Sequence, residues 1–430
     1  MRYLLVNPAY GHLYQKSRFN AIMTHGFIPL NLLCVAGELL RLGHRVVILD
    51  LNYTPEGDIV EYIKRFDPDI FGITATTPLS DKAKQLCAKA KSYKPTLKTL
   101  IGGVHATVMP EDYKDCADID NVYCGEFEEY RHDLDSIPFP AYELIYPERY
   151  TSSPLLSRRS PVGLLETSRG CYGKCCYCTR AVQGKTLRFK SPMLVIEEIK
   201  YVLGRGFREI HFIDDNLTAD QNRAHDIFEK CIKDNISFTW TPRNGVRANR
   251  LSRELLSVMK RSGCYRIPIG VESGSQKVLD RTGKGVRLEE VERAVQWCKE
   301  IGLETELYFM IGLPGETEED LQKTCDFAAK LKPDFAKIAP AIPYPGTGLN
   351  DYLQNRGLLR SKDYSLYHYS GRVEEIYTHD TLSWNIINKY IKRFYINLYM
   401  RPGYIGRALI RAIKTKTLLE SMRVAWKTQW

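Results

Sequence analysis

The chain has 430 residues, 44% hydrophobic and 26% charged, which is the composition of a folded globular protein of roughly two or three domains. No run approaches the ~18 apolar residues of a membrane span, and the first residues lack the apolar region of a signal peptide. With twelve cysteines and no such signal, we expect reduced thiols and a cytoplasmic protein.

The net charge of +10 is concentrated at the C-terminal end. Residues 389–430 contain ten Lys or Arg and a single acid, Glu420, so this segment alone carries +9. The rest of the chain is almost neutral, which argues against a basic nucleic-acid surface spread over the whole protein.

The first 130 residues alternate strand and helix patterns. We expect strands at residues 3–6, 45–49, 70–75, 99–101 and 121–124, with helices at 29–42, 58–66 and 80–93. This alternation predicts a doubly wound, flavodoxin-like or Rossmann-like α/β domain with a parallel sheet. A receiver domain or a nucleotide-binding domain is the alternative that the pattern leaves open.

Small and polar residues follow the last three of these strands. Such sheets bind ligands at the carboxyl ends of their strands, and paired glycines let the backbone approach a bulky ligand closely. The candidate ligand edge therefore comprises Thr74, Thr76, Thr77, Gly102, Gly103, His105, Gly125 and Glu126.

A proline-rich linker is expected at residues 131–160. Pro138 and Pro140 favour extended backbone, and residues 147–161 have a loop composition. We expect this linker to run over the surface.

Cys171, Cys175 and Cys178 stand in a C-x3-C-x2-C spacing directly after an apolar run at residues 162–166, with Tyr177 before the last cysteine. Three thiolates in so short a loop can converge on one metal centre. They leave one position open, because a closed zinc site or a cubane cluster takes four ligands. A zinc knuckle and inert buried cysteines are the alternatives. Cys176 falls outside the spacing, and we expect it to be a bystander.

Repeated strand–helix units follow, with strands expected at residues 162–166, 209–213, 236–241, 266–271, 304–311 and 335–341. They predict a partial or complete parallel barrel whose chemistry lies on the loops after the strands. Those loops carry Asp215, Asn216, Arg243, Arg247, Glu272, Ser273, Gly312, Pro314 and Glu316. Either arginine could hold a carboxylate with two hydrogen bonds.

Residues 1–350 resemble the cobalamin-dependent radical S-adenosylmethionine (SAM) enzymes. The resemblance rests on the cysteine loop, the Gly-x-Glu-Ser-Gly and Gly-Leu-Pro-Gly-Glu-Thr segments, and the Thr-Ala-Thr-Thr, Gly-Gly-x-His-Ala and Gly-Glu order before them. It implies a cobalamin-binding domain at residues 1–130, a partial (β/α)6 radical SAM barrel at residues 161–350 and a helical, basic C-terminal region at residues 351–430.

The resemblance also implies the ligands. Cys171, Cys175 and Cys178 would hold a [4Fe-4S] cluster whose open iron takes SAM. The candidate ligand edge of the first domain would hold cobalamin. The implied SAM-binding residues are Tyr177, Asp215, Asn216, Arg243 for the SAM carboxylate, Glu272, Ser273, Gly312, Pro314 and Glu316. The Asp-x-His-x-x-Gly motif, whose histidine ligates cobalt in many cobalamin proteins, is absent. The lower axial ligand of cobalt is therefore left open. His12, Tyr14 and His25, in the loop at residues 7–28, could approach that face of the cofactor, or the loop could simply be solvated.

The implied function is a methyltransferase that acts on an unactivated carbon through a 5′-deoxyadenosyl radical and methylcobalamin. A non-methylating cyclisation or rearrangement, a non-catalytic cobalamin or iron–sulfur sensor and a tRNA-modifying enzyme are the alternatives. The expected partners are a small-molecule, lipid or peptide substrate and an electron donor such as flavodoxin or ferredoxin, with no nucleic acid.

The C-terminal region has a long amphipathic helix at residues 384–400, followed by a shorter apolar and basic pattern. Two roles are open for it. It could pack on the barrel and close its open side, or its basic side could contact an anionic membrane, which would make the protein peripheral to the inner face of that membrane.

Overall fold

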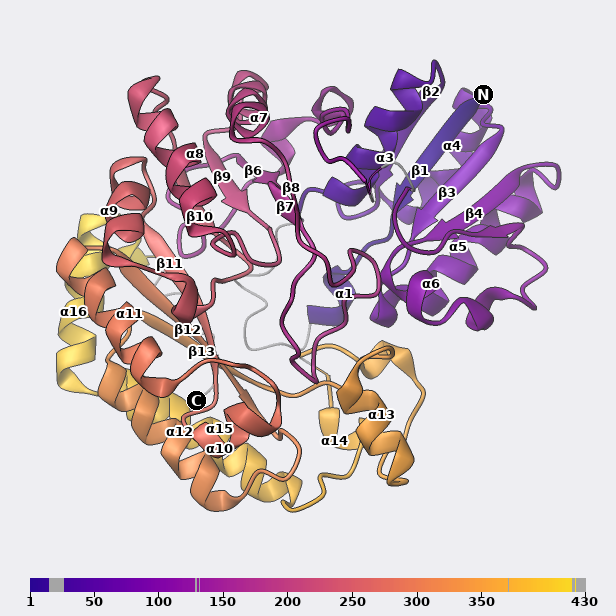
Figure 1. Ribbon diagram of the computed structural model, residues 1–430. Helices are drawn as coiled ribbons and strands as arrows, with labels where there is room; N and C mark the ends of the chain where they lie inside the picture. Colours follow the sequence, from indigo (N-terminus) through magenta and orange to yellow (C-terminus); the bar gives the residue numbers. More distant parts are fainter. Residues whose placement is uncertain (15–26, 128–129, 131, 370, 420–421, 423–430) are drawn as a thin grey trace.

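The computed structural model describes residues 1–14, 27–127, 130, 132–369, 371–419 and 422 (Figure 1). His25 lies outside these residues, as do the side chains of His12 and Tyr14.

The first part of the chain is a doubly wound α/β domain with five parallel strands in the order β2-β1-β3-β4-β5. The strands are β1 (Arg2–Asn7), β2 (Arg45–Asp50), β3 (Ile70–Thr74), β4 (Lys98–Gly102) and β5 (Asn121–Val122). The helices are α1 (Gly11–Tyr14), α3 (Leu30–Arg41), α4 (Ile59–Phe66), α5 (Ser80–Tyr93) and α6 (Val104–Val108). This strand order is the flavodoxin-like one, so the predicted fold class is confirmed.

The alternation of side chains along β1 explains why helices cover both faces of this sheet. Leu4 and Val6 belong to the core beneath α4 and α5, whereas Leu5 belongs to the core beneath α3. Successive side chains of a strand point to opposite faces, so one apolar run supplies two cores.

The second part is a partial barrel of six parallel strands, β6, β9, β10, β11, β12 and β13, in that spatial order. Two bridges, Trp240–Cys264 and Val246–Ile269, join β10 to β11 and so link two three-stranded groups. The strands are β6 (Val162–Leu165), β9 (Glu209–Phe212), β10 (Thr239–Pro242), β11 (Arg266–Glu272), β12 (Glu304–Ile311) and β13 (Phe335–Pro340). The helices are α7 (Pro192–Gly204), α8 (Gln221–Lys233), α9 (Arg253–Arg261), α10 (Gln276–Arg281), α11 (Leu288–Ile301) and α12 (Glu318–Leu331).

The third barrel strand begins later than the sequence suggested. The predicted strand at residues 236–241 is β10, which starts at Thr239. The backbone N–H of Ile236 donates to Cys231 O at the end of α8, and Asn235 has a left-handed conformation with φ of 53°. These residues terminate the preceding helix, so they are not free to pair in the sheet.

The linker does not run over the surface, so that expectation was wrong. Tyr142, Ile145 and Tyr150 are buried in the same core as Leu33 of α3 and Leu165 of β6. The Ala141 N–H donates to Leu33 O over 3.0 Å, and the Tyr150 hydroxyl donates to Asp50 Oδ2 over 3.0 Å. Large aromatic and aliphatic side chains outweigh the extended preference of the prolines, because their burial stabilises the junction of the two parts.

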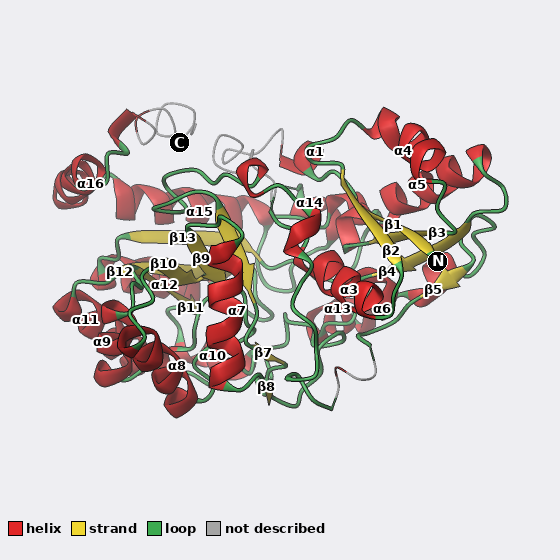
Figure 2. Ribbon diagram, turned by 90° about the horizontal axis from the view of Figure 1, so that it is seen from above, coloured by secondary structure: helices red, strands yellow, loops and turns green. Residues whose placement is uncertain are grey.

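The C-terminal region folds back over both parts. Its helices are α13 (Gly348–Asn355), α14 (Val373–Ile376), α15 (Trp384–Tyr399) and α16 (Pro402–Lys414), and α15 lies along α12 and the edge strand β13 (Figure 2). No helix among the described residues has the length and apolarity to cross a lipid bilayer.

Candidate active site

The cysteine loop begins at a small hairpin, β7 (Ser168–Arg169) with β8 (Arg188–Phe189), at the carboxyl end of β6. Gly170 has φ of 85°, and a side chain there would collide with the Thr186 carbonyl, so the chain can turn into the loop only with glycine. A Cβ on Gly173 would lie 3.3 Å from Cys171 Sγ and 3.8 Å from Cys175 Sγ. Absence of a side chain at Gly173 thus leaves room for two thiols to face one point.

Cys178 completes this group. Part of its side chain reaches solvent, yet burial and then the neighbouring Cys175, Asp215 and Cys171 raise the pKa of its thiol to about 11. A thiol with so high a pKa becomes a thiolate at neutral pH only when a cation binds it. Three soft donors fit an iron–sulfur cluster in which each thiolate binds a different iron. Among the described residues, no group of three or more His, Cys, Asp or Glu side chains, the three cysteines included, is arranged to hold a single metal ion.

Cys176 has a different role. Its backbone N–H donates to Thr282 O over 2.9 Å, and its carbonyl accepts from the Leu349 N–H over 2.7 Å. The residue therefore anchors the loop to the C-terminal end of α10 and to the first turn of α13.

Several buried polar atoms around the loop have no hydrogen-bond partner in the part of the chain that the structure describes. A buried polar atom without a partner costs free energy, so such a group indicates a missing ligand or water. Those from the cysteine loop between β7 and β8 and from the loops after β9, β10 and β12 are Tyr177 Oη, Gln183 Oε1, Asp214 Oδ2, Asn216 Nδ2, Arg247 Nε, Asn249 Oδ1 and Glu316 Oε1. This set of donors and acceptors fits a polar ligand such as SAM.

Asp215 borders the same region. It is exposed, but burial of its surroundings, with Glu166 and Asp214 nearby, raises the pKa of its carboxyl group to about 6.

The two candidate arginines point to different places. Arg243 reaches into the barrel, where its Nη1 lies 3.7 Å from Glu306 Oε2, a carboxylate shared with Arg266 and Lys337. Arg247 lies against the cysteine loop: its Nη1 is 3.2 Å from the position of a Cβ on Gly173, and its guanidinium lies over Tyr172. The geometry favours Arg247 for a ligand at the cysteines, whereas the family resemblance implied Arg243.

The side chains of Glu272 and Ser273, although adjacent in the sequence, also lie in different places. Glu272 has φ of 68° and forms a buried ion pair with Lys284 over 2.7 Å. Burial of Tyr177, and then the charge of Glu272, raise the pKa of the Tyr177 hydroxyl. Ser273 is fully buried, and its Oγ lies 3.1 Å from Thr324 Oγ1 of α12. Ser273 therefore fixes the strand to a helix, while Glu272 lies beside the cysteine loop.

Two sets of hydrogen bonds fix the turn at residues 312–317: one from Glu316 within the turn, and one from residues of the C-terminal region. Glu316 Oε2 accepts hydrogen bonds from the N–H groups of Gly312 (2.7 Å) and Leu313 (3.1 Å). Tyr377 donates to Gly312 O over 3.2 Å, and His379 Nε2 lies 2.9 Å from Leu313 O. Asp380 accepts from the Gly315 N–H over 3.0 Å, and Pro314 O accepts from Arg281.

Tyr377, His379 and Asp380 were not found from the sequence. The polar run Thr378-His-Asp-Thr381 before the start of α15 was their signal, because buried polar residues outside regular structure need partners.

At the N-terminal domain, only part of the predicted ligand edge is open. Thr76 is exposed, and Gly102, Gly103 and Gly125 are half-buried. Gly103 has φ of 101° and lies so close to Ala75 O and Thr74 that no side chain fits. These positions offer backbone to a large ligand.

Other residues of the predicted ligand edge are buried and hold its loops in place by hydrogen bonds. His105 is fully buried, with Nε2 3.0 Å from Asp112 Oδ2 and Nδ1 3.3 Å from Thr77 Oγ1, and Tyr364 packs edge-on against it. Thr74 Oγ1 accepts from Asn31 over 2.8 Å. Since both nitrogens of His105 are engaged, its ring positions the edge.

Glu126 pairs with the barrel. Its carboxylate lies 2.8 Å from Arg169 Nη1 and 2.6 Å from Arg188 Nη1, and Arg169 also pairs with Glu166 over 2.7 Å. Gly346, after β13, packs on Val108 of α6 and on Thr179 of the cysteine loop. The ligand edge therefore adjoins the cysteine loop. The two parts of the chain that carry them lie side by side, with β7 and β8 next to the N-terminal domain (Figure 1).

Two family models match the chain. The B12 binding domain matches residues 24–134, and the Radical SAM superfamily matches residues 165–328. An uncharacterized methyltransferase of Pyrococcus horikoshii is 31% identical, over 87% of this chain and 88% of the relative. Cytidylyl-2-hydroxyethylphosphonate methyltransferase of Streptomyces wedmorensis is 27% identical, over 80% of each chain.

Two solved structures share the fold. The radical SAM methyltransferase TsrM from Kitasatospora setae, with cobalamin and a [4Fe-4S] cluster bound, superposes with a TM-score of 0.66 at 16% identity, over 83% of this chain and 78% of that chain. The cobalamin-dependent SAM radical enzyme OxsB, with aqua-cobalamin bound, gives a TM-score of 0.71 at 16% identity, over 98% and 71%. At these identities the likeness concerns the fold.

Proposed function

This chain belongs to the cobalamin-dependent radical SAM enzymes, and we propose that it is a methyltransferase that acts on an unactivated carbon of a small-molecule substrate. Its cofactors are a [4Fe-4S] cluster, SAM and cobalamin. When bound, these groups supply hydrogen abstraction by a carbon radical and transfer of a methyl group. The observation that carries the proposal is the group of three thiols bordered by buried polar atoms without partners.

We assign the cluster to Cys171, Cys175 and Cys178. Arg247, rather than Arg243, would hold the SAM carboxylate, and Asp215 with Asn216 would receive the amino group, because these groups border the thiols. Tyr177 and Glu272 would line the same site, with Lys284 keeping the Glu272 carboxylate in place. The turn from Gly312 to Glu316 would supply flat backbone for the adenine.

Cobalamin would contact the exposed Thr76 and the backbone of Gly102, Gly103 and Gly125, with Thr77, His105 and Glu126 as supports. Because Glu126 ties this edge to the barrel, the domain junction would exclude water and fix the distance between the cofactors.

We further propose a reduced compartment, the cytoplasm, and an electron donor of the flavodoxin or ferredoxin type. All twelve cysteines are free thiols, including buried ones such as Cys264 and Cys298.

The experiment is anaerobic reconstitution of the full chain with iron, sulfide and cobalamin, followed by incubation with reductant and SAM that carries a labelled methyl group. We expect formation of 5′-deoxyadenosine and, with a small-molecule extract, products that gain one labelled methyl. 5′-Deoxyadenosine without any labelled product would point to cyclisation or rearrangement instead.

Two variants test the ligand assignment. Cys178→Ala should lower bound iron and sulfide to background, whereas Cys176→Ala, in the same loop, should keep both, because Cys176 acts through its backbone. Unchanged iron in the Cys178→Ala protein would refute the assignment.

A further inference from the structure

Helix α16 is oriented with its aliphatic side outward. Toward the barrel it turns Tyr404, whose hydroxyl donates to Asp334 O over 3.0 Å, and Arg411, which pairs with Asp334 over 3.3 Å. Ala412 is its one buried residue. The helix is therefore fixed to the protein by polar contacts and a small side chain.

The outer side of α16 consists of large apolar residues. Ile405, Leu409 and Ile413 recur every fourth residue and are 50%, 49% and 58% exposed, and Ile410 beside them is 56% exposed. Ile396 and Met400 at the end of α15 are 50% and 58% exposed. We call these six residues the C-terminal apolar patch.

This patch is unusual within the molecule. More than half of the large apolar side chains that are exposed in the described chain lie after residue 395. Single exposed apolar residues are ordinary, but a contiguous group marks a surface that contacts something.

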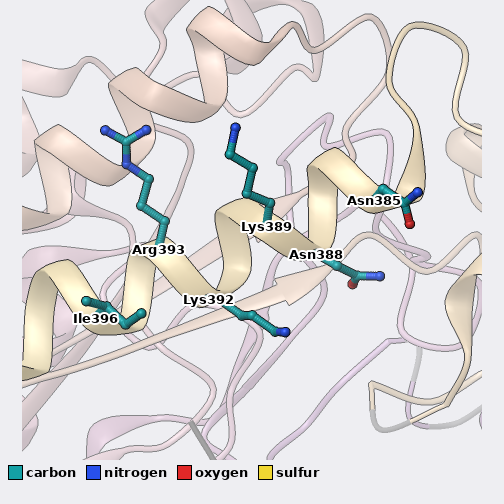
Figure 3. Close-up of a pocket in the computed structure, with 6 residues that line it drawn as sticks. All are labelled: Asn385, Asn388, Lys389, Lys392, Arg393 and Ile396. Carbon is teal, nitrogen blue, oxygen red and sulfur yellow. The ribbon is translucent and has the colours of Figure 1, made fainter.

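The charge around the patch indicates what that partner is. Residues 384–414 contain seven Lys or Arg and no acid. On α15, Lys389, Lys392, Arg393 and Ile396 line a hollow of about 670 Å³, with Lys389 and Arg393 pointing to one side of the helix and Lys392 to the other (Figure 3). Lys389 lies 3.5 Å from Glu318, and on α16 Arg407 and Lys414 are exposed beside the apolar residues.

Apolar side chains flanked by cations match the surface of an anionic bilayer. The aliphatic groups would enter the boundary between head groups and acyl chains, while the cations meet lipid phosphates. A second copy of this chain is a poorer match, because it would bring two cationic surfaces together. α16 has 13 residues, a length of about 20 Å, which is shorter than the ~30 Å hydrocarbon core and suits a helix lying in the plane of the surface.

We propose that the C-terminal apolar patch and the basic residues of α15 and α16 bind the surface of an anionic membrane. This binding site is on the side chains of α15 and α16 that point away from the barrel, so it does not depend on the proposed methyl transfer.

The test is sedimentation of the full chain with vesicles of phosphatidylcholine alone or with about 30% phosphatidylglycerol. We expect co-sedimentation with the anionic vesicles only, reduced several-fold when salt rises from about 0.1 M to about 0.5 M. Leu409→Asp with Ile413→Asp, and separately Arg407→Glu with Lys414→Glu, should each reduce the bound fraction at least roughly tenfold, because both attractions are needed.

Matched controls change exposed residues elsewhere. Leu42→Asp replaces an apolar side chain that is 55% exposed, and Lys64→Glu with Lys98→Glu makes the same charge change as the basic variant on the N-terminal domain. Unchanged thermal unfolding shows that the variants fold. Equal vesicle binding by patch and control variants would overturn the proposal. A dimer in the absence of lipid that Leu409→Asp dissociates would also overturn it, in favour of a second copy as the occupant.

Discussion

Glu316 is a fully buried carboxyl group whose two oxygens have different surroundings. Oε2 accepts two backbone N–H groups of the turn after β12, whereas Oε1 has no partner. The two donors favour the carboxylate, but burial outweighs them and raises the pKa of Glu316 to about 8. At neutral pH the turn is therefore shaped around a largely protonated side chain.

We predict that Glu316→Gln changes how stability depends on pH. The folded pKa of about 8 lies above the ordinary glutamate value of 4.5, so the folded state holds the proton more tightly than the unfolded state. The free energy of unfolding of the native protein should fall as pH rises from about 4.5 to about 8, by at most about 4 kcal/mol. Glutamine accepts the same two N–H bonds and cannot ionise, so the variant should lack this decline.

Urea unfolding of both proteins between about pH 6 and 9 measures the difference. The variant should gain relative stability as pH rises. Parallel curves over this range would show that Glu316 does not titrate there.

For single residues, the sequence predicted which residues stand near the site better than it predicted where their side chains point. The cysteine spacing located the thiols because all three lie within one short loop. Arg243, Ser273 and His105 stand at strand ends, where the alternation of side chains stops and the loop geometry decides which way each points. Arg243 turns into the barrel, and His105 turns into its own domain, a distinction that no residue pattern records.

Among the elements, α15 covers the open edge of the barrel, where the backbone groups of β13 have no further strand of the described chain to pair with. Tyr399 Oη lies 2.9 Å from Ala336 N and 2.7 Å from Ala336 O, and Tyr395 Oη lies 3.3 Å from Ile338 N and 3.2 Å from Ile338 O. Residues four apart on a helix advance about 6 Å, close to the advance of two residues on a strand. Two tyrosines can thus partner alternate residues of β13, which covers an edge that could otherwise pair with another chain.

We predict that Tyr395→Phe with Tyr399→Phe lowers the free energy of unfolding by about 2–4 kcal/mol, since four backbone groups lose a buried partner. Hydrogen exchange should show lost protection at the Ala336 and Ile338 amides. Tyr93→Phe, at a tyrosine that is 45% exposed, is the control and should change neither quantity. Retained protection at both amides would show that water or repacking replaces the hydroxyls.

The helix itself could be predicted from its apolar periodicity, and α15 at Trp384–Tyr399 matches the expected residues 384–400. Packing on the barrel to close its open side was one of the two roles that the sequence left open. The pairing with β13 could not be predicted, because Tyr395 and Tyr399 count only as aromatic positions until their neighbour along the strand edge is known. The linker shows the same limit of sequence-based prediction. Its prolines could be read from the sequence, but the burial of Tyr142 and Tyr150 could not, because the core that they join is formed by segments far apart in the chain.

For the whole molecule, the decisive feature is the junction that places the two cofactor regions together. Glu126 follows Gly125 at the ligand edge, and Arg169 precedes Gly170 at the start of the cysteine loop, so their ion pair joins the two regions directly. Arg188 and Glu166 extend the pair into a buried network. Such networks hold a fixed geometry because each charge depends on its neighbours for compensation.

The last prediction concerns this junction. Glu126→Gln leaves Arg188 and Arg169 with one fewer counter-charge in a site where the Glu126 side chain is only 7% exposed. We expect a cost of about 2 kcal/mol at the junction, which corresponds to cobalamin binding weaker by up to roughly thirtyfold. Bound iron should be unchanged, because the cysteines are intact. Optical titration with cobalamin and iron analysis measure the two quantities, and Glu61→Gln, in an exposed pair with Arg65, is the control.

A double-mutant cycle separates this positioning role from direct contact between Glu126 and cobalamin. Arg188 belongs to the barrel, so Arg188→Gln should weaken cobalamin binding in the same way, and the double variant should be little worse than either single one. Additive losses would mean that Glu126 acts on cobalamin by itself. If neither variant altered the affinity, the junction would not set the geometry of the cobalamin site, and the two parts of the chain would be held in register by the buried linker instead.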